Sequence, residues 1–458
     1  MNEIEAKRVL VVGAGVAGLT AAEALAQRGA LVTVAEREQV VGGLARSYRY
    51  DGATFDVGPH RFHTDDREVE ALVLDTLGAD HRIIDRSSAV WLYNDYHEWP
   101  LTRASLLKLP PLVMARAFFD LFHRPRARDD SLESYVLSRY GATLYEVFFR
   151  PYTEKFLSYR CRDLHRDWAS AGINRAVIDR RLRFDSLLHV ARTTLFPPHV
   201  ETRFIYPESD GIDRFVEALS RRITDRGGTV LTGAPVVALE REGHEVRAAV
   251  VGDDGHRVEL DLLVWTAPLP LLLSLLGLPP VGLLYLAEVL FNFVVRGEAA
   301  LPYQWTYYGG AALSFMRASQ STRFNPRNAD RGLNGICVEV VCQEGDDLWR
   351  EPERLRRDIE KDLERVGLVR SRDDVRGLHV ERVREAYPVY TLDYPGRLDR
   401  AIEHLAEVRN VALLGRTGTF WYNNMDHSAR QALDLVSVLA AGASAGHWNV
   451  GLRSRRAL

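Results

Sequence analysis

Near its start the chain passes from an apolar run to a helical pattern and back to an apolar run. Residues 9–12 are all apolar, as in a central parallel strand that is buried on both faces. Residues 17–28 carry the small and apolar side chains of a buried helix, and Gly29 follows where such a helix would end. Residues 31–36 form a second largely apolar run. The pattern predicts strand, turn, helix and strand, the first unit of a parallel sheet.

Later segments carry strand patterns that suit the same sheet. Residues 227–251 predict a strand, a turn and a hairpin, residues 261–268 predict a strand, and residues 411–435 predict a strand, a glycine-rich turn and a helix. We therefore expect an α/β fold, α+β overall, with a Rossmann-like domain assembled from separated pieces of chain. The expected division is a discontinuous Rossmann-like domain over 1–100, 199–268 and 383–458, a helical lobe over 101–198, and a mixed β-sheet domain over 269–382.

The composition is that of a globular protein large enough for two or three lobes. The chain has 458 residues, of which 46% are hydrophobic and 26% are charged. The formal net charge of -3 gives no general attraction to nucleic acid or to an anionic membrane, so neither is expected as a partner. The sequence leaves the oligomeric state open, a homo-oligomer included.

The most apolar segment, residues 262–284, is long enough to raise the question of a membrane span. Pro268, Pro270, Pro279 and Pro280 divide it into pieces that are too short to cross a bilayer. We interpret it as a strand, a short helix and a loop.

Cysteine usage and the first residues bear on the cellular compartment. Cys161, Cys337 and Cys342 show no metal-type CxxC spacing, and an odd, sparse set suits reduced thiols better than a disulfide framework. Residues 1–15 lack the charged and apolar regions of a signal peptide. A cytoplasmic protein is expected.

The turn after the first strand carries a glycine pattern with a known physical use. Gly13, Gly15 and Gly18 form G-x-G-x-x-G, in which the first glycine permits the turn and the second lets a pyrophosphate approach the backbone. The third allows close packing of the helix on the strand. The following helix presents free N–H groups to phosphate, and Glu36, at the end of the second strand, can accept the ribose hydroxyls. The unit predicts dinucleotide binding.

A second glycine pair favours FAD over NAD. The segment "REQVVGGLARSY" places Gly42 and Gly43 shortly after the acidic strand, where they offer more backbone donors along an extended dinucleotide. This pair resembles the GG motif that follows the Rossmann unit in the amine oxidase–like flavoprotein superfamily.

The segment "FDVGPHRFHT" holds two histidines, His60 and His63, just after a glycine and a proline. Their spacing alone leaves three alternatives open: a metal pair, an acid/base pair, or two ordinary polar residues in a loop. No Cys, His or Asp cluster accompanies them, so a metal site is not expected.

The same segment resembles the GPH-x-FHT motif of bacterial UDP-galactopyranose mutases. Four further motifs resemble elements of that family in the same order: "PYTEKFL", "SFMRASQSTRFNP", "EAYPVYTLDYPGR" and "GRTGTFWYNNMDHS". The resemblance implies an NDP-sugar mutase that interconverts pyranose and furanose forms of a nucleotide-activated hexose. In that family N5 of reduced FAD attacks the anomeric carbon and no net oxidation results. NAD(P)H is a candidate external reductant.

The resemblance also assigns roles. Arg317, in "FMR", would bind the substrate diphosphate, whose charge grows as it leaves and requires guanidinium and phenol donors. His60 would lie against the isoalloxazine ring. A second arginine is expected from the helical lobe, with Arg175 as the first candidate and Arg180 or Arg181 still open. The residues expected in catalysis are His60, Arg317, Arg416, Tyr387 and Tyr422. Those expected to bind substrate are His63, Tyr152, Leu157, Arg175, Tyr307 and Asn424. For His63 a loop-stabilising hydrogen bond is an equal alternative.

The FAD contacts implied by the glycine motifs and by the resemblance come from five parts of the chain. They are Gly13, Gly15, Val16, Ala17, Gly18, Glu36, Arg37, Gly42, Gly43, Leu44, Ala45, Val236, Gly415, Arg416, Met425 and Ser428.

One position departs from the family. The bacterial element ends in a tryptophan that flanks the uracil base, and Leu157 stands there in this chain. Without that indole the sequence leaves the nucleotide open among UDP, GDP and TDP.

Two other functions share parts of the pattern. A flavin oxidase or desaturase of a small molecule, similar to protoporphyrinogen oxidase or carotenoid enzymes, would share the FAD motifs but would not explain "GPHRFHT" together with Arg317 and the tyrosines. A non-catalytic binding protein on the same scaffold would not need the intact glycine motifs.

Overall fold

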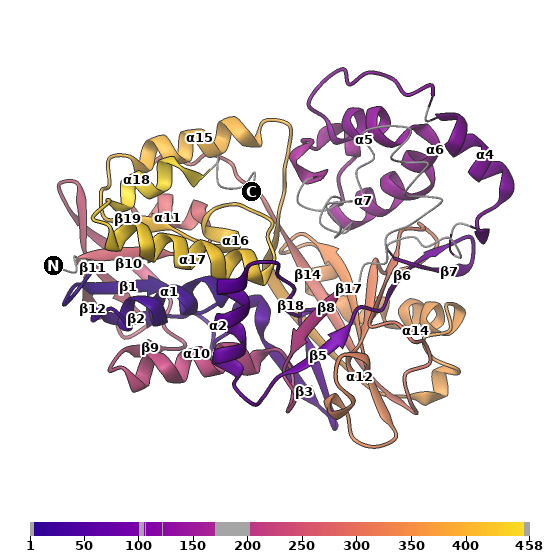
Figure 1. Ribbon diagram of the computed structural model, residues 1–458, viewed down its shortest axis with the longest axis horizontal. Helices are drawn as coiled ribbons and strands as arrows, with labels where there is room; N and C mark the ends of the chain where they lie inside the picture. Colours follow the sequence, from indigo (N-terminus) through magenta and orange to yellow (C-terminus); the bar gives the residue numbers. More distant parts are fainter. Residues whose placement is uncertain (1–3, 100–104, 106, 121, 170–201, 453–458) are drawn as a thin grey trace.

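The computed structural model describes residues 4–99, 105, 107–120, 122–169 and 202–452. Figure 1 shows a parallel sheet with its helices on one side of the molecule, a large antiparallel sheet beside it, and a helical lobe above that sheet. The fold is α/β, α+β overall, as the sequence predicts.

The parallel sheet joins pieces of chain that are far apart in sequence. Its order is β19–β13–β1–β2–β9, and Leu10 at its centre lies between Thr33 and Leu263. Both faces of the central strands are covered, which explains their continuous apolar runs. The strands are β1 (Arg8–Val12), β2 (Leu31–Ala35), β9 (Thr229–Leu231), β13 (Leu262–Trp265) and β19 (Val411–Leu413).

The helix after β1 is enclosed on all sides. Every residue of α1 (Val16–Ala26) is buried, because α1 packs against α17 (Met425–Ala440), α10 (Asp213–Asp225) and the sheet. Its alanine-rich sequence allows this close approach. A three-stranded antiparallel sheet lies nearby and consists of β10 (Val236–Glu242), β11 (Glu245–Val251) and β12 (His256–Glu259).

The antiparallel sheet beside it has seven strands in the order β18–β14–β17–β16–β15–β6–β7. Alternation along β14 divides it into two faces: Ala287, Val289 and Phe291 pack in the apolar cluster that includes α14, while Glu288 and Asn292 lie on the opposite face. The strands are β6 (Ser88–Leu92), β7 (Asp95–Glu98), β14 (Tyr285–Arg296), β15 (Trp305–Tyr308), β16 (Arg317–Gln320), β17 (Leu333–Cys342) and β18 (Val375–Pro388), and α14 spans Arg356–Arg365.

Two strands differ from the expected division of the chain. Residues 88–98 were expected in the Rossmann-like domain, but β6 and β7 form a hairpin that extends the seven-stranded sheet. The reason is a long-range pairing, because β6 runs parallel to β15 with Val90 opposite Tyr307. Local sequence cannot reveal such a pairing. The other boundaries stay predictions.

The described part of the helical lobe contains α4 (Pro111–Asp120), α5 (Leu132–Tyr140), α6 (Ala142–Leu144) and α7 (Arg150–Leu157). A π-helical turn, Tyr145–Phe149, leads directly into α7, and such turns are frequent at functional sites. Within the described residues, no helix is both long and apolar enough to cross a bilayer.

The remaining elements connect these bodies. They are β3 (Ser47–Tyr50), β4 (Ala53–Asp56), α2 (Arg67–Leu77), β5 (Arg82–Asp85), β8 (Arg203–Tyr206), α11 (Leu269–Leu275), α12 (Ser321–Phe324), α13 (Asp347–Arg350), α15 (Tyr394–Leu405), α16 (Gly415–Gly418) and α18 (Ala445–Val450).

Candidate active site

A cavity of about 560 Å³ opens at the carboxyl end of β1 and β2, which is where α/β folds bind ligands. Every residue that the sequence assigned to FAD lines this cavity, from Gly13 at one end of the chain to Ser428 at the other. His60 and Asn424 line it as well. The structure therefore brings these predicted residues together, and we call the space that they line the FAD-type cavity.

The glycine turn forms a cradle that fits a pyrophosphate. A Cβ on Gly18 would lie 2.0 Å from the carbonyl oxygen of Gly13, so this glycine is required for the helix to pack on the strand. A Cβ on Gly15 would meet no protein atom closer than 3.8 Å and would instead occupy cavity space. No side chain caps the N-terminus of α1, and its first turn holds no acidic residue. Its free N–H groups are available to an anion.

Glu36 is held in place for a second contact. Its carboxylate accepts hydrogen bonds from the backbone N–H of Ala14, at 2.7 Å, and of Glu38, at 3.0 Å. These bonds fix the carboxylate at the end of β2, where ribose hydroxyls are bound in dinucleotide folds. The neighbouring Arg37 is less available, because it donates to Glu385 at 2.9 Å.

The other wall of the cavity comes from the C-terminal segment. Gly415 donates its N–H to the side chain of Gln431 at 2.8 Å, which ties the turn to α17. Arg416 donates to the carbonyl oxygen of Ala386 at 3.1 Å, and its guanidinium lies 4.9 Å from the centre of the Tyr422 ring. Asn424 is the N-cap residue of α17 and makes no side-chain cap there.

His60 is a neutral hydrogen-bond acceptor in this environment. Its Nδ1 contacts the carbonyl oxygen of Val57 and must carry the hydrogen there. Burial lowers the pKa of His60 to about 3, helped by the charges of Arg416, Arg317 and Arg61. Its Nε2 is therefore unprotonated at neutral pH and can accept a hydrogen bond from a bound group.

Beneath this loop lies an ion pair on the polar face of the large sheet. Arg317 donates two hydrogen bonds to Glu339, one of them from Nε to Oε1 at 2.6 Å, across directly paired positions of β16 and β17. Glu339 is fully buried. Gly58 rests on it, since a Cβ on Gly58, whose φ is +65°, would lie 2.7 Å from Oε2 of Glu339. The histidine loop and the arginine thus share one support.

A second carboxyl group completes the cluster. Tyr387 lies 3.2 Å from Nη2 of Arg317 and donates to Glu288 at 3.3 Å. Burial raises the pKa of Glu288 well above its usual range, and the charge of Glu339 and the hydrogen bond shared with it act in the same direction. Glu288 therefore holds its proton more strongly than a free glutamate does, next to the ion pair of Arg317 and Glu339.

Aromatic side chains continue from this cluster. Tyr422 stacks on Trp168 with ring centres 4.9 Å apart and meets Tyr387 edge to face at 5.6 Å. Tyr152 on α7 meets Tyr307 on β15 edge to face at 5.4 Å. The tyrosines predicted at the substrate site therefore converge from the helical lobe, the large sheet and the C-terminal segment.

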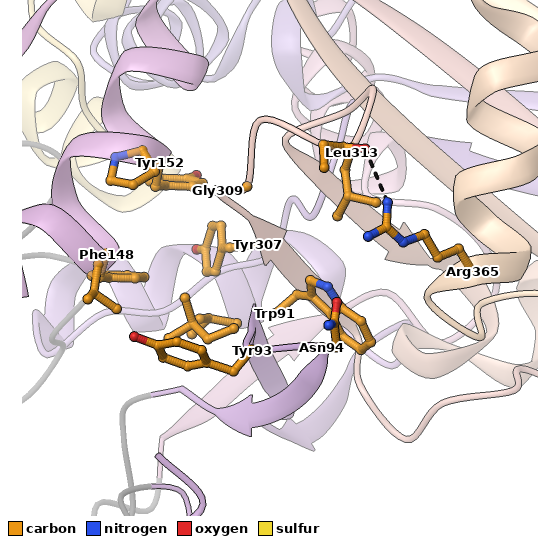
Figure 2. A pocket seen from close by; sticks show the side chains of 15 residues that line it. Trp91, Tyr93, Asn94, Phe148, Tyr152, Tyr307, Gly309, Leu313 and Arg365 are labelled. Carbon is orange, nitrogen blue, oxygen red and sulfur yellow. Dashed lines mark hydrogen bonds between the residues drawn. The ribbon is translucent and has the colours of Figure 1, made fainter. Parts of the chain in front are cut away.

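Tyr152 and Tyr307 also line a second cavity, of about 270 Å³, between the lobe and the β6–β7 hairpin. Figure 2 shows Tyr152 and Phe148 on one side, Trp91 with the hairpin tip below, and Arg365 opposite. The tip is strained, because Tyr93 and Asn94 both have positive φ, at 52° and 58°. Bulky residues rarely adopt this conformation, and it is common near binding sites. Aromatic side chains form much of its wall, so we call it the aromatic cavity.

Two of the predicted substrate residues, Leu157 and His63, are not brought together with the others. Leu157 is 0% exposed and lines neither cavity, so the structure does not place it with the other predicted substrate residues, and its contact with substrate stays a prediction. It lies five residues after Tyr152 and hence roughly 140° around the helix axis, on the face that enters the core. His63 lines neither cavity and interacts with the carbonyl oxygen of Arg203 at 3.2 Å, which agrees with the loop-stabilising alternative. Arg175 lies outside the described residues, as do Arg180 and Arg181.

Sequence reasoning missed four charged residues of the site. Glu288 and Glu339 each interrupt an otherwise apolar strand, "YLAEVLFNFVVR" and "LNGICVEVVC", and a charge at an inward strand position is a usable signal. Arg61 stands inside the histidine motif itself, and Arg86 precedes β6. Among the described residues, no group of three or more Cys, His, Asp or Glu side chains is placed to hold a metal ion.

A family model described as flavin containing amine oxidoreductase matches residues 16–284, more than half of the chain. The chain therefore belongs to the flavin-containing amine oxidoreductase family. This membership implies FAD as the cofactor, and the glycine cradle, the oriented Glu36 and the shape of the first cavity fit it.

Known relatives include enzymes of different activity. Phytoene dehydrogenase of Streptomyces griseus is 28% identical over 309 residues, which are 59% of this chain and 56% of that protein. Protoporphyrinogen oxidase 2 (chloroplastic/mitochondrial) of Arabidopsis thaliana is 47% identical over 78 residues, 17% of this chain and 15% of that protein. The chain thus matches little more than half the length of the first relative and a small part of the second.

A solved structure titled reduced UDP-galactopyranose mutase has a TM-score of 0.80 with this chain at 19% identity. The match covers 95% of this chain and 94% of that one. At this level of identity, the likeness shows a shared fold.

Proposed function

We propose that this protein is an NDP-sugar mutase that interconverts the pyranose and furanose forms of a nucleotide-activated sugar without net oxidation. The observation that carries the proposal is the cluster of Arg317, Tyr387 and Tyr422 between the FAD-type cavity and the aromatic cavity. Guanidinium and phenol donors at this point suit an anionic leaving group. They suit neither a hydrocarbon nor a cationic amine.

Arg317 is the principal diphosphate group in this proposal. Glu339 fixes two of its nitrogens, so the guanidinium has one orientation before substrate arrives and loses little conformational freedom on binding. Nη1 has no protein partner in the described part of the chain and is the donor left for the diphosphate. Tyr422 supplies an O–H donor alongside it as the charge on the leaving group grows, whereas Tyr387 donates its O–H to Glu288, accepts from Arg317 and so keeps the guanidinium in place.

The aromatic cavity is the proposed site of the nucleoside. Tyr152, Phe148 and Trp91 give it flat apolar walls, and bases bind between such walls by stacking. The side chain of Asn94 at the hairpin tip carries both a donor and an acceptor for the edge of a base. In the absence of a tryptophan at position 157, Trp91 is the indole that lines this cavity.

His60 has the role of an acceptor beside the reacting atoms. A reduced flavin, when bound, would supply a nucleophilic nitrogen for the anomeric carbon of the sugar. Nε2 of neutral His60 would accept a hydrogen bond from a sugar hydroxyl or from the flavin edge and so orient it. The electrons come from an external reductant, for which NAD(P)H is the candidate.

The test is a panel of UDP-, GDP- and TDP-sugars, neutral and acidic, incubated with FAD-loaded protein and analysed for furanose products. Activity is expected after reduction with dithionite or NAD(P)H and not with oxidised flavin. The absence of any furanose product across the panel, with flavin shown to be bound and reduced, contradicts the proposal.

A second candidate follows from the relatives. Similarity to phytoene dehydrogenase over 309 residues favours an FAD-dependent oxidase or desaturase of a small molecule. Such an enzyme would consume the substrate by oxidation and leave the flavin reduced, so anaerobic bleaching of the flavin by a polyene or a porphyrinogen would support it. Sugar nucleotides would cause no bleaching.

A further inference from the structure

Two arginines near the site lack an acidic partner. Arg61 donates to the carbonyl oxygen of Pro59 at 2.8 Å, and Arg86 donates to the hydroxyl of Ser88 at 3.0 Å. Neither forms an ion pair with a carboxylate in the described part of the chain. The carboxylate of Asp426 acts on Arg61 only through space.

Burial of these two guanidinium groups without an acidic partner costs folding free energy. Nε of Arg61 and Nη1 of Arg86 are buried without a hydrogen-bond partner. Burial lowers the pKa of Arg61, and it lowers that of Arg86 to about 10. Buried charges are normally paired, so two guanidinium groups that contact the same indole and act on each other's charge without an acidic partner among the described residues indicate that an anion completes them.

One indole organises the pair. The guanidinium carbon of Arg61 lies 4.5 Å from the centre of the Trp305 ring, and that of Arg86 lies 5.4 Å from it. Phe204 supports Arg61 from another direction, at 4.9 Å. Stacking on rings holds the planar donor forks in fixed orientations, which suits two-point binding of a carboxylate.

Arg61 and Arg86 lie apart from the diphosphate site because the indole that they contact, Trp305, is at the start of β15. The aromatic cavity reaches Gly309 and Gly310, just beyond the strand, and Tyr307 lies next to Arg317. Trp305 lies two residues earlier, so it stands roughly 7 Å beyond Tyr307, away from that cavity. Arg86 extends β6 in the same direction, since Ser88 pairs with Trp305.

On the side away from the aromatic cavity, Arg61 and Arg86 are close to the FAD-type cavity. Arg61 directly follows His60, which lines that cavity, and its charge acts on His60. Passing from the aromatic cavity, a ligand would therefore meet Tyr307 and Arg317 first and Arg61 with Arg86 afterwards, beside the flavin end. In a nucleotide sugar, the sugar follows the nucleoside and the diphosphate in this same order, so it would lie beside Arg61 and Arg86.

We propose that Arg61 and Arg86 form a second anion subsite that binds a carboxylate on the sugar, so that the substrate is a nucleotide-activated uronic acid. This inference rests on the proposed function and narrows it from hexoses in general to acidic sugars. The planar carboxylate would accept from both guanidinium groups, and the diphosphate would remain with Arg317.

The experiment is calorimetric binding to oxidised, FAD-loaded protein, in which no turnover occurs. The probes are matched pairs: UDP-glucuronic acid with UDP-glucose, UDP-galacturonic acid with UDP-galactose, and GDP-mannuronic acid with GDP-mannose. We expect the best acidic sugar to bind at least about tenfold more tightly than its neutral partner, because the two arginines add charge-assisted hydrogen bonds.

Arg61→Met and Arg86→Met test the residues, because methionine keeps an apolar chain against Trp305. Each should reduce the preference to within about threefold, with the flavin spectrum and thermal midpoint recording whether the variant folds. The control is Arg365→Met in the aromatic cavity, which should change both members of a pair by the same factor. If one variant fails to fold, the other variant and the wild-type preference still decide.

Several results would overturn the proposal: equal binding of acidic and neutral sugars by the wild type, a preference that survives in both variants, or an equal loss of both sugars in Arg61→Met and Arg86→Met. The last result would show that Arg61 and Arg86 bind the diphosphate, which both members of each pair carry. Selective binding of the uronate without furanose product from the reduced enzyme would contradict the proposed function instead. Furanose product from neutral sugars, without any preference for acidic sugars, would contradict the carboxylate subsite and leave the proposed function intact. The absence of any binding would contradict both proposals.

Discussion

Arg317 and Glu339 face each other on adjacent strands and form a two-point ion pair at the base of the site. The pair connects three features: the loop of Gly58 that carries His60, the phenol of Tyr387, and the carboxyl group of Glu288. Strand pairing fixes the backbone positions of Arg317 and Glu339, and the hydrogen bonds between their side chains fix the guanidinium against the carboxylate. The cluster is thus rigid before any ligand binds.

Replacement of Arg317 should affect activity and stability together. We expect Arg317→Ala to reduce turnover by roughly 10³-fold, because the leaving group loses its main positive partner. The free energy of unfolding should also fall by about 3 kcal/mol, because Glu339 is left buried and unpaired. Steady-state kinetics and urea unfolding measure the two effects.

The double variant Arg317→Gln, Glu339→Gln provides the control. It removes both charges and should recover much of the stability but none of the activity. An Arg317→Ala protein that loses FAD would contradict the placement of this residue on the substrate side.

Glu288 should make the protein less stable as the pH rises. Its pKa is raised in the folded state, so folding takes up a proton at pH values between the ordinary pKa of a glutamate and the raised pKa of Glu288. Its contribution is fully present below that range and is lost as the pH rises towards the folded pKa. Glu288→Gln resembles the protonated form and should remove this slope. Urea unfolding of both proteins between pH 5.5 and 8, values chosen to bracket neutrality, is the measurement. A wild-type slope that Glu288→Gln does not alter would show that Glu288 is ionised in the folded protein.

His60 should have the opposite pH dependence. Its pKa is lowered to about 3, so the unfolded chain binds a proton below its ordinary pKa of 6.5 while the folded protein does not. Stability should therefore fall as the pH decreases below 6.5, by about 2 kcal/mol at pH 5 relative to pH 8. His60→Asn should abolish this loss, measured by unfolding at the two pH values. Unchanged pH dependence in the variant would contradict a neutral, buried His60.

Gly15 offers a test of the cofactor cradle that leaves the fold intact. A Cβ there meets open cavity space and φ is -80°, an ordinary value, so Gly15→Ala should fold with a thermal midpoint near that of the FAD-free wild type. FAD affinity should fall by roughly 100-fold, because the methyl group occupies the path of the pyrophosphate. Gly18→Ala is the contrasting variant, since it cannot pack α1 on β1 and should fail to fold. Wild-type FAD affinity in Gly15→Ala would place the dinucleotide elsewhere.

The local part of this protein is readable from the sequence. The strand, glycine turn, helix and strand at the start of the chain form as predicted, and so do the hairpin at 236–251 and the strand and helix at 411–440. Apolar periodicity, glycine turns and prolines act over a few residues, so a single chain records them. The residues predicted around FAD line one cavity, and most of them lie in or directly beside the glycine turns that the sequence shows.

Only the tertiary structure decided what lies on the substrate side. Glu339 acquires its partner because β16 and β17 pair in one register, and Trp305 meets Arg61 and Arg86 because β6 pairs with β15. Leu157 lies in the core and lines neither cavity because of its position around α7. Strand pairing and helix rotation join residues hundreds of positions apart, and burial then lowers the pKa of His60 and raises that of Glu288. No local pattern carries that information, since both effects arise only when the separate elements pack together.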